Sequence, residues 1–289
     1  MAVAHTPWQQ LPAEVHIAVE KRLGSAYTVQ TSDAGANNGT NATLTLTDST
    51  RLFIKGQFGR APREFLDPVA DPQDGSDWWG ADWGPVDQLN EEARINPYLP
   101  AASPRVLWRE EVADWHLVAF EWIDGRHADY RPGSPDIAAT AQALADLGAC
   151  RIPPIPLPTA RDRWGYYCDR DVRHLLDGGG TLLHTDPAEV NVLVDAHARA
   201  HLVDWAWPAV GPGWINPALW GLRLVAAGHD FADAAAWASE IPAWAEATPG
   251  AVKAFTRAEA RRWTDEADRG TYGADSLVDD VLAWADFWV

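Results

Sequence analysis

The residues with the clearest potential for chemistry lie in one stretch, from His184 to Trp205. Asp186 stands in a polar loop, Asn191 follows where the chain becomes apolar again, and Asp204 ends the next apolar run. Phosphoryl transfer from a nucleotide needs a carboxylate that orients a hydroxyl, together with oxygen ligands for a divalent cation. Each of these three residues is common in turns when it occurs alone. The prediction of a phosphotransferase site therefore depends on the spacing of all three between apolar strands.

The pattern His-x-Asp-x-x-x-x-Asn, followed by an apolar run and Asp-Trp, resembles that of the aminoglycoside phosphotransferase-like kinases. These are relatives of protein kinases that phosphorylate small molecules. The resemblance implies that Asp186 is the catalytic base and that Asn191 and Asp204 are ligands of Mg2+. It also implies ATP or GTP as the phosphate donor. His184 is expected to brace the loop rather than to take part in catalysis.

The stretch departs from the commonest pattern of that family at three places. Residues 187–188 are Pro-Ala where Leu-His is frequent, and Glu189 adds a negative charge near the expected phosphates. Asn216 stands where the family usually has an aspartate that braces the catalytic loop. We expect this third departure to be mild, because an asparagine oxygen also accepts backbone N–H bonds.

The first quarter of the chain has the pattern of an antiparallel meander, which would provide a nucleotide-binding sheet. A helix is predicted at 12–23 and strands at 27–31, 42–47 and 51–55. The turn-rich link at 33–41 joins the first two strands and contains Gly39. A glycine permits close approach of backbone N–H groups to phosphates. The resemblance therefore makes Gly39 a nucleotide-binding candidate, although such a loop is more simply a hairpin connection.

Lys55 ends the third predicted strand, on the face opposite to its apolar residues. The resemblance implies that this lysine neutralises the α- and β-phosphates and pairs with a glutamate of the next helix. Residues 91–99 have the acid–apolar spacing of that helix, with Glu92 as the partner and Glu91 as the alternative in another register. A solvated lysine and an exposed acidic helix start are the simpler interpretation without the resemblance.

Residues 67–87 are rich in Asp, Pro, Gly and Trp, which predicts an irregular loop. The composition fits both a lid over a cleft and a surface segment. Strands at 105–108 and 115–121 would complete a five-stranded sheet. The sequence that follows resembles the hinge between kinase lobes. There, a backbone carbonyl near Glu121 and an amide near Ile123 would bind the adenine base.

The second half of the chain predicts mainly helices, at 134–147, 164–176, 217–228, 232–240, 252–267 and 276–287. Candidates to face a substrate are two tryptophans and several acids of the later helices: Trp207, Trp214, Asp230, Asp233, Glu240 and Glu246. Most such acids are more simply part of a solvated helix surface. Most of the 17 tryptophans are expected to pack in the core.

The 289 residues include 41 acidic and 23 basic side chains, which gives a net charge of −18. Such a charge repels a phosphate backbone and argues against nucleic acid as a partner. It would attract a cationic acceptor such as an aminoglycoside, or it simply keeps the protein in solution. The chain lacks an apolar run of membrane-spanning length and a signal-peptide pattern, and two cysteines are too few for a disulfide framework. We therefore predict a cytoplasmic monomer or homodimer that does not associate with membranes.

The predicted fold class is α/β (α+β), with a two-lobed protein-kinase-like architecture. Residues 1–120 would form a small antiparallel-sheet lobe, and residues 121–289 a larger, mainly helical lobe. The predicted function is transfer of the γ-phosphate of ATP or GTP to a hydroxyl of a small molecule, for which a cationic aminoglycoside-like antibiotic is one candidate. Three alternatives stay open: a kinase of another metabolite such as an amino alcohol or a nucleoside, a nucleotide-binding pseudokinase without turnover, and a metal-dependent hydrolase.

Overall fold

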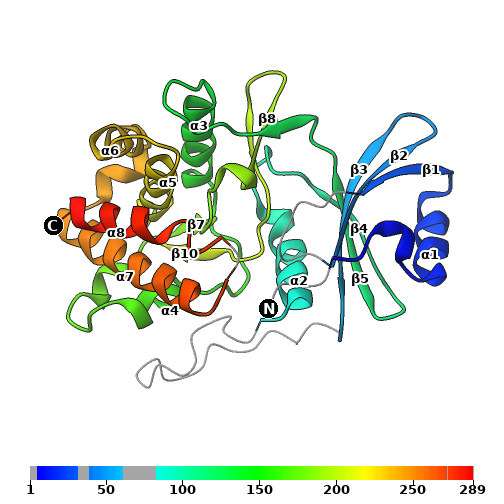
Figure 1. Ribbon diagram of the computed structural model, residues 1–289, viewed down its shortest axis with the longest axis horizontal. Coiled ribbons are helices and arrows are strands. Elements are labelled where there is room, and N and C mark those ends of the chain that lie inside the picture. The colour runs from blue at the N-terminus through cyan, green and yellow to red at the C-terminus, as the bar shows by residue number, and fades with distance from the viewer. Residues whose placement is uncertain (1–4, 32–38, 61–82, 272, 289) are drawn as a thin grey trace. The chain divides into compact units, whose positions relative to one another are not determined.

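The computed structural model describes residues 5–31, 39–60, 83–271 and 273–288. Its contacts divide the chain into two compact units (Figure 1). The smaller unit ends at Ile123, and the larger unit begins at Asp124 and also includes Tyr98–Ser103. The smaller unit contains an antiparallel sheet, and most of the larger unit is helical. The predicted fold class is confirmed.

The sheet of the smaller unit has five antiparallel strands in the order β1-β2-β3-β5-β4. The strands are β1 (Tyr27–Thr31), β2 (Thr40–Leu46), β3 (Arg51–Phe58), β4 (Val106–Val112) and β5 (Trp115–Glu121). All five were predicted. However, β3 continues to Phe58, so the prediction that Lys55 ends this strand was wrong. The strand continues because Gly56 still pairs with Thr40 of β2 and Leu117 of β5, and Gln57 pairs with His116 of β5.

Each face of this sheet is covered by a different helix, because successive side chains of a strand point to opposite faces. On one face, α1 (Ala13–Leu23) and the short η1 (Trp8–Gln10) pack Val15, Val19 and Trp8 against Leu44 and Ile54. On the other face, α2 (Pro85–Ile95) packs Leu89 and Ala93 against Val118 and Phe120. The side chain of Lys55 belongs to the α2 face, since Ile54 before it faces α1.

The start of α2 corrects two predictions. Residues 67–82 of the predicted loop lie outside the described residues, but its last residues, from Pro85, already belong to α2. The helix predicted at 91–99 therefore begins earlier than expected. Asp87 accepts a hydrogen bond from the Gly84 N–H at 2.9 Å, which caps the first turn, and a proline suits the first helical position. The helix ends at Ile95 and passes into η2 (Asn96–Tyr98), because Pro97 cannot continue it.

The larger unit contains two small sheets that carry the predicted catalytic stretch. One has three antiparallel strands in the order β6-β8-β9, and the other pairs β7 with β10. The strands are β6 (Gly125–His127), β7 (Thr181–Leu183), β8 (Val192–Asp195), β9 (Ala200–Leu202) and β10 (Ala209–Gly211). The chain from β7 to β9 therefore forms the strand, loop and hairpin that the sequence pattern predicted.

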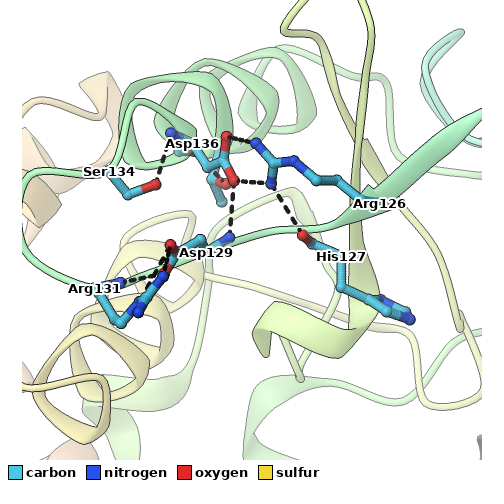
Figure 2. Close-up of polar contacts among 7 residues, drawn as sticks. Arg126, His127, Asp129, Arg131, Ser134 and Asp136 are labelled. Atoms are coloured by element: carbon cyan, nitrogen blue, oxygen red, sulfur yellow. Dashed lines mark hydrogen bonds and ion pairs between the residues drawn. The ribbon is translucent and has the colours of Figure 1, made fainter.

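A cluster of charged residues connects β6 to the next helix, α3 (Asp136–Gly148), as Figure 2 shows. The buried Asp136 carboxylate accepts hydrogen bonds from both terminal nitrogens of Arg126, at 2.5 and 2.9 Å, and from the Asp129 N–H at 2.8 Å. The Arg126 guanidinium holds the pKa of Asp136 below its usual value, against the opposing effect of burial. Ser134 accepts the Asp136 N–H at 3.2 Å, although α3 begins after it. Within the same turn, the Ala128 N–H donates to the Val192 carbonyl of β8 at 2.9 Å. The cluster therefore fixes a turn that lies beside β8.

The remaining helices of the described chain are α4 (Ala160–Trp164), α5 (Ile215–Ala226), α6 (Phe231–Ser239), α7 (Pro249–Asp268) and α8 (Val278–Phe287), with short 3-10 turns η3 (Gly165–Tyr167), η4 (Arg173–Leu176), η5 (Glu189–Asn191) and η6 (Pro242–Glu246). The predicted helices after residue 216 are confirmed within a few residues. The single helix predicted at 164–176 was wrong, because α4 ends where it should begin. Gly165 and the Asp- and Cys-containing run that follows are poor helix formers, and two 3-10 turns form there instead.

Aromatic side chains fill the core of the larger unit. Phe255 of α7 packs edge-on against Trp164 of α4 and against Trp214, with ring centroids 5.1 and 5.7 Å apart. Fully buried tryptophans of this unit also include Trp205, Trp220 and Trp284, and Trp8 is fully buried in the smaller unit. Trp214 is therefore a core residue, and the hypothesis that it faces a substrate is wrong. Among the described residues, no helix is both long and apolar enough to cross a membrane.

Candidate functional site

The loop after β7 is tied to β9 and its continuation by the imidazole of His184. Its Nε2 donates to the Val203 carbonyl at 2.8 Å, and its Nδ1 accepts the Asp186 N–H at 3.4 Å. The ring also lies 4.5 Å from the ring of Trp205. Because His184 is buried and both ring nitrogens make these bonds, the histidine orders the backbone on either side of the loop.

Asp186 has a carboxylate with two different sides. On one side, Oδ2 accepts the Asn191 Nδ2–H at 3.0 Å, and the same amide donates to the Asp186 carbonyl at 3.0 Å. On the other side, Oδ1 accepts a hydrogen bond from Arg223 of α5 at 2.6 Å. The side chain is still 43% exposed, so a hydroxyl from solution has access to it. Each carboxylate oxygen has a second lone pair that can accept such a hydroxyl.

Asn191 ends η5, directly before β8, and its orientation fits a metal ligand. Its Nδ2 donates to Asp186, and this directs the amide oxygen away from that carboxylate. Its backbone carbonyl accepts the Val203 N–H at 3.0 Å, which brings the residue before Asp204 against it. Among the described residues no group of three His, Cys, Asp or Glu side chains forms a metal site. An amide oxygen, a carboxylate and phosphate oxygens are nevertheless a donor set that suits Mg2+.

Two residues in this stretch have unusual backbone conformations. Thr185 and Asp204 have φ values of 70° and 64°, in the left-handed region. That region is rare for a β-branched residue such as threonine and costs about 1–3 kcal/mol. Thr185 is held there by its hydroxyl, which donates to the Trp207 carbonyl at 2.7 Å. Such strain is concentrated at functional sites, and here it lies directly before Asp186 and at Asp204 itself.

The position of Asn216 on α5 explains how the loop tolerates an asparagine in place of the aspartate. Its Oδ1 accepts the His184 N–H at 3.1 Å, as the sequence predicted, and its Nδ2 donates to the Leu182 carbonyl at 3.1 Å. Asn216 is 1% exposed, so no water replaces either bond. An aspartate at this position would provide the acceptor but not the donor.

We expect Asn216→Ala to lower the free energy of unfolding by about 1–3 kcal/mol, because two buried backbone groups lose their partners. Asn216→Asp should also be destabilising, because a carboxylate would face the Leu182 carbonyl. Urea unfolding of both variants and of the wild type measures these changes. An unchanged midpoint for Asn216→Ala would contradict the bonding described here.

Arg223, which contacts Asp186, was missed by sequence reasoning, and so was Tyr130. Arg223 lies 37 positions after Asp186, and its place in α5 gave no local signal. The buried Tyr130 donates its hydroxyl to the Pro187 carbonyl at 3.1 Å, and burial raises the pKa of this phenol. Tyr130, which precedes α3 in the chain, therefore holds the loop at residues 187–188 in place.

A buried glutamate of α7 organises the aromatic and cationic side chains near Arg223. Glu259 accepts hydrogen bonds from Arg262, Trp164 and Trp263, at distances between 2.6 and 2.9 Å. The Trp263 ring lies 5.2 Å from the guanidinium of Arg223 and 4.5 Å from that of Arg262. Burial alone would raise the pKa of Glu259, but the Arg262 charge and these hydrogen bonds lower it to about 2.

The depressed pKa predicts an acid-sensitive contribution to stability. The stability due to Glu259 is complete above its ordinary pKa of 4.5 and is lost as the pH falls towards about 2. At neutral pH, Glu259→Gln should cost about 3–5 kcal/mol, because Arg262 remains buried without its counter-charge. The difference in stability between wild type and variant should shrink as the pH falls through that window. Chemical unfolding of both proteins across the pH range tests this, and a pH-independent difference would contradict it.

In the smaller unit, Lys55 forms a buried ion pair with α2. Its Nζ lies 2.9 Å from both carboxylate oxygens of Glu92, and the two side chains are 9% and 6% exposed. Glu91 pairs instead with Arg94, at 2.6 Å. Of the two glutamates that the sequence left open, Glu92 is therefore the one that pairs with Lys55. The role of this pair in binding a nucleotide stays a prediction.

The other nucleotide-binding candidates lie at or just beyond the ends of two inner strands of the same sheet, β2 and β5. The Gly39 N–H donates to Gln57 at 2.9 Å, and a Cβ at Gly39 would lie 3.1 Å from the Gly56 carbonyl oxygen. Close packing thus explains a glycine at this position. Glu121 is the last residue of β5, and Ile123 is the last residue of the smaller unit. Binding of a nucleotide by Gly39, Glu121 and Ile123 stays a prediction.

No protein-family model matches the chain, and no curated protein matches it in sequence. Solved structures do match. The chain is similar to the aminoglycoside phosphotransferase APH(4)-Ia, with a TM-score of 0.61 and 12% identity over 94% of this chain and 97% of that one. It is also similar to choline kinase LicA from Streptococcus pneumoniae, with a TM-score of 0.55 and 12% identity over 95% of this chain and 98% of that one.

A third similar structure is spectinomycin phosphotransferase APH(9)-Ia in complex with ADP and spectinomycin. Its TM-score is 0.55, with 10% identity over 96% of this chain and 95% of that one. Identities this low show the fold and leave the substrate open. The chain has the two-lobed fold of protein-kinase-like small-molecule kinases, as its motif predicted.

Proposed function

We propose that this protein transfers the γ-phosphate of ATP or GTP to a hydroxyl of a small molecule in a Mg2+-dependent reaction. The observation that carries the proposal is the state of Asp186. Its carboxylate is fixed by Asn191 and Arg223 and is nevertheless 43% exposed. A group that is oriented from two sides and still reachable is what a positioned base requires.

In the proposed reaction, the acceptor hydroxyl donates a hydrogen bond to the Asp186 carboxylate. Its oxygen attacks the γ-phosphorus, the bond between that phosphorus and the bridging oxygen breaks, and the proton passes to Asp186. The nucleoside diphosphate leaves with the bridging oxygen. Little covalent chemistry is needed from the protein, so positioning and charge account for most of the rate enhancement.

The other residues hold the nucleotide. Asn191 and Asp204 would bind Mg2+, which when bound neutralises negative charge on the phosphates. Lys55, oriented by Glu92, would neutralise the α- and β-phosphates, as in related folds. Backbone groups near Glu121 and Ile123 would bind the base, and Gly39 would leave room beside the phosphates.

Release of ADP or GDP in the presence of Mg2+ tests the proposal. The acceptor panel should include aminoglycosides such as hygromycin B and spectinomycin, choline and other amino alcohols, nucleosides, and hydroxylated acids. We expect acceptor-dependent release together with a phosphorylated product. Binding of nucleotide without any product would favour the pseudokinase alternative. Nucleotide cleavage at the same rate with and without acceptors, and insensitive to Lys55→Ala, would favour a hydrolase.

A further inference from the structure

The two sides of the Asp186 carboxylate have opposite chemical character. On the Asn191 side lie the amide and carboxylate oxygens proposed to bind Mg2+, so this side belongs to the nucleotide. On the Arg223 side lie the indole ring of Trp263 and the guanidinium of Arg262, both from α7. If Asp186 orients the acceptor hydroxyl, the second side is where the rest of the acceptor lies.

Arg163 of α4 lies near this cluster, since the charges of Arg262 and Glu259 both act on its guanidinium. Its guanidinium lies 5.5 Å from the ring of Trp207 and 5.3 Å from that of Trp164. The Trp207 carbonyl in turn accepts a hydrogen bond from the hydroxyl of Thr185, the residue directly before Asp186. Arg163 is therefore next to the catalytic loop, and the charge of Asp186 acts on it.

The cations around Asp186 are not equally paired. Arg223 pairs with Asp186 at 2.6 Å, and Arg262 pairs with Glu259 at 2.7 Å. Glu266, the other acid that acts on this group, accepts a hydrogen bond from Thr271 at 2.6 Å. Among the described residues Arg163 has no ion pair, and its buried Nε–H has no hydrogen-bond acceptor.

The side chain of Arg163 is half-buried, but its Nε–H is shielded from solvent and has no acceptor. Burial and the neighbouring charge of Arg262 lower the pKa of Arg163 to about 10, although Glu259 and Asp186 oppose the change. A buried donor without an acceptor destabilises a protein, and buried cations are normally paired. A bound anion would remove both penalties. A guanidinium with a free Nε–H and its terminal N–H groups also has the forked geometry that binds a carboxylate or a phosphate through two bonds.

We infer that the molecule phosphorylated by this protein bears an anionic group, a carboxylate or a phosphate, and that Arg163 binds this group beside Trp207. The inference rests on the proposed function, because it assumes that Asp186 orients an acceptor hydroxyl. It makes Arg163 a specificity residue of the acceptor site.

The net charge of −18 favours the opposite kind of acceptor at long range. Charges in direct contact with the ligand outweigh it, because salt screens the field of distant surface charges over about 8–10 Å. The total charge affects the rate of encounter more than the choice of ligand. The cationic acceptor suggested by composition is therefore less suited to this side of Asp186 than an anion.

The test measures binding and compares the protein with Arg163→Gln. The probes are three hydroxylated scaffolds, each in an anionic, a neutral and a cationic form: hexose derivatives (glucuronate, glucose and glucosamine), three-carbon alcohols (glycerol 3-phosphate, glycerol and 3-aminopropane-1,2-diol) and two-carbon alcohols (glycolate, ethylene glycol and ethanolamine). Saturation-transfer NMR in the presence of Mg2+ and ADP detects weak binding. Arg170→Gln, which removes an exposed arginine of the same unit, is the matched control.

We expect the wild type and Arg170→Gln to prefer the anionic members, and Arg163→Gln to bind them about 10- to 100-fold more weakly, the scale of one charge-assisted hydrogen-bonded pair. Arg163→Lys should recover part of the loss. Absence of a preference for anions, or a preference that survives in Arg163→Gln, overturns the inference.

A second measurement separates the acceptor from the γ-phosphate as the source of the anion. If Arg163 binds the acceptor, the ratio of AMP-PNP to ADP affinity should be the same in Arg163→Gln and the wild type. Selective loss of AMP-PNP affinity would assign Arg163 to the nucleotide and overturn the inference. The proposed function fails separately: a protein that binds anions through Arg163 but neither binds nor cleaves nucleotides would refute the kinase reaction and leave the anion site in place.

Discussion

Asp186→Asn is expected to lower turnover by at least ~100-fold, the usual scale for the loss of a positioned base. The amide no longer accepts a proton, and it cannot satisfy its two present partners in the same way. One side of the carboxylate accepts from Asn191 and the other from Arg223, whereas an amide has one acceptor and one donor side. Nucleotide affinity should change little, because Asp186 is not among the proposed metal or phosphate ligands.

Steady-state release of ADP, with AMP-PNP affinity measured on the same samples, checks this expectation. Asp171→Asn is the matched control, since Asp171 is exposed in the same unit. Equal turnover in Asp186→Asn and the control would remove Asp186 from the role of base. Loss of turnover together with loss of the folded state would call for Asp186→Ser, which retains an acceptor oxygen without providing a base of comparable strength.

The second large effect is expected for the Lys55–Glu92 pair, and it concerns stability as well as activity. Lys55→Met or Glu92→Leu alone should each destabilise the smaller unit by about 3–5 kcal/mol, because the remaining charge stays buried. The double variant Lys55→Met/Glu92→Leu should regain most of that stability, because it buries no uncompensated charge. It should nevertheless fail to turn over, because the positive charge proposed to face the phosphates is absent.

Chemical unfolding of the wild type, the two single variants and the double variant gives the coupling free energy. Lys21→Met, at an exposed position of α1, is the matched control for loss of a lysine. If the single variants are as stable as the control, neither charge depends on its partner for stability, which would contradict the buried ion pair described here. If the stable double variant keeps full activity, Lys55 has no role at the phosphates.

Local pattern was sufficient for most of the fold. The strands of the smaller unit alternate clearly, and the later helices have strong apolar periodicity, so both were predicted within a few residues. The pairing of Lys55 with Glu92 was predicted from the family resemblance, and Glu91 stayed open as the alternative in another register. The helix predicted at 164–176 failed because Gly165 and the polar run after it favour 3-10 turns. The start of α2 was missed because its cap, Asp87, resembled the loop before it.

The sequence predicted the candidate site residues of one continuous stretch, but not those that other helices contribute. Spacing along the chain pointed to Asp186, Asn191 and Asp204. The hairpin of β8 and β9 brings the residues before and after it close together. The side chains that surround Asp186 from elsewhere in the chain carry no such spacing. Arg223 comes from α5, and Arg163 from α4, and their contacts form only when tertiary packing assembles the larger unit.

Helix α5 supports the loop that carries Asp186 at two points. Asn216, near its first turn, holds the backbone at His184, and Arg223, near its last turn, holds the carboxylate of Asp186. Seven helical positions correspond to nearly two turns, so both side chains project from one face, about 10 Å apart along the axis. A tilt of this helix would therefore displace the Asp186 carboxylate and the backbone at His184 together rather than separately. A displacement of this kind would preserve the internal geometry of the loop.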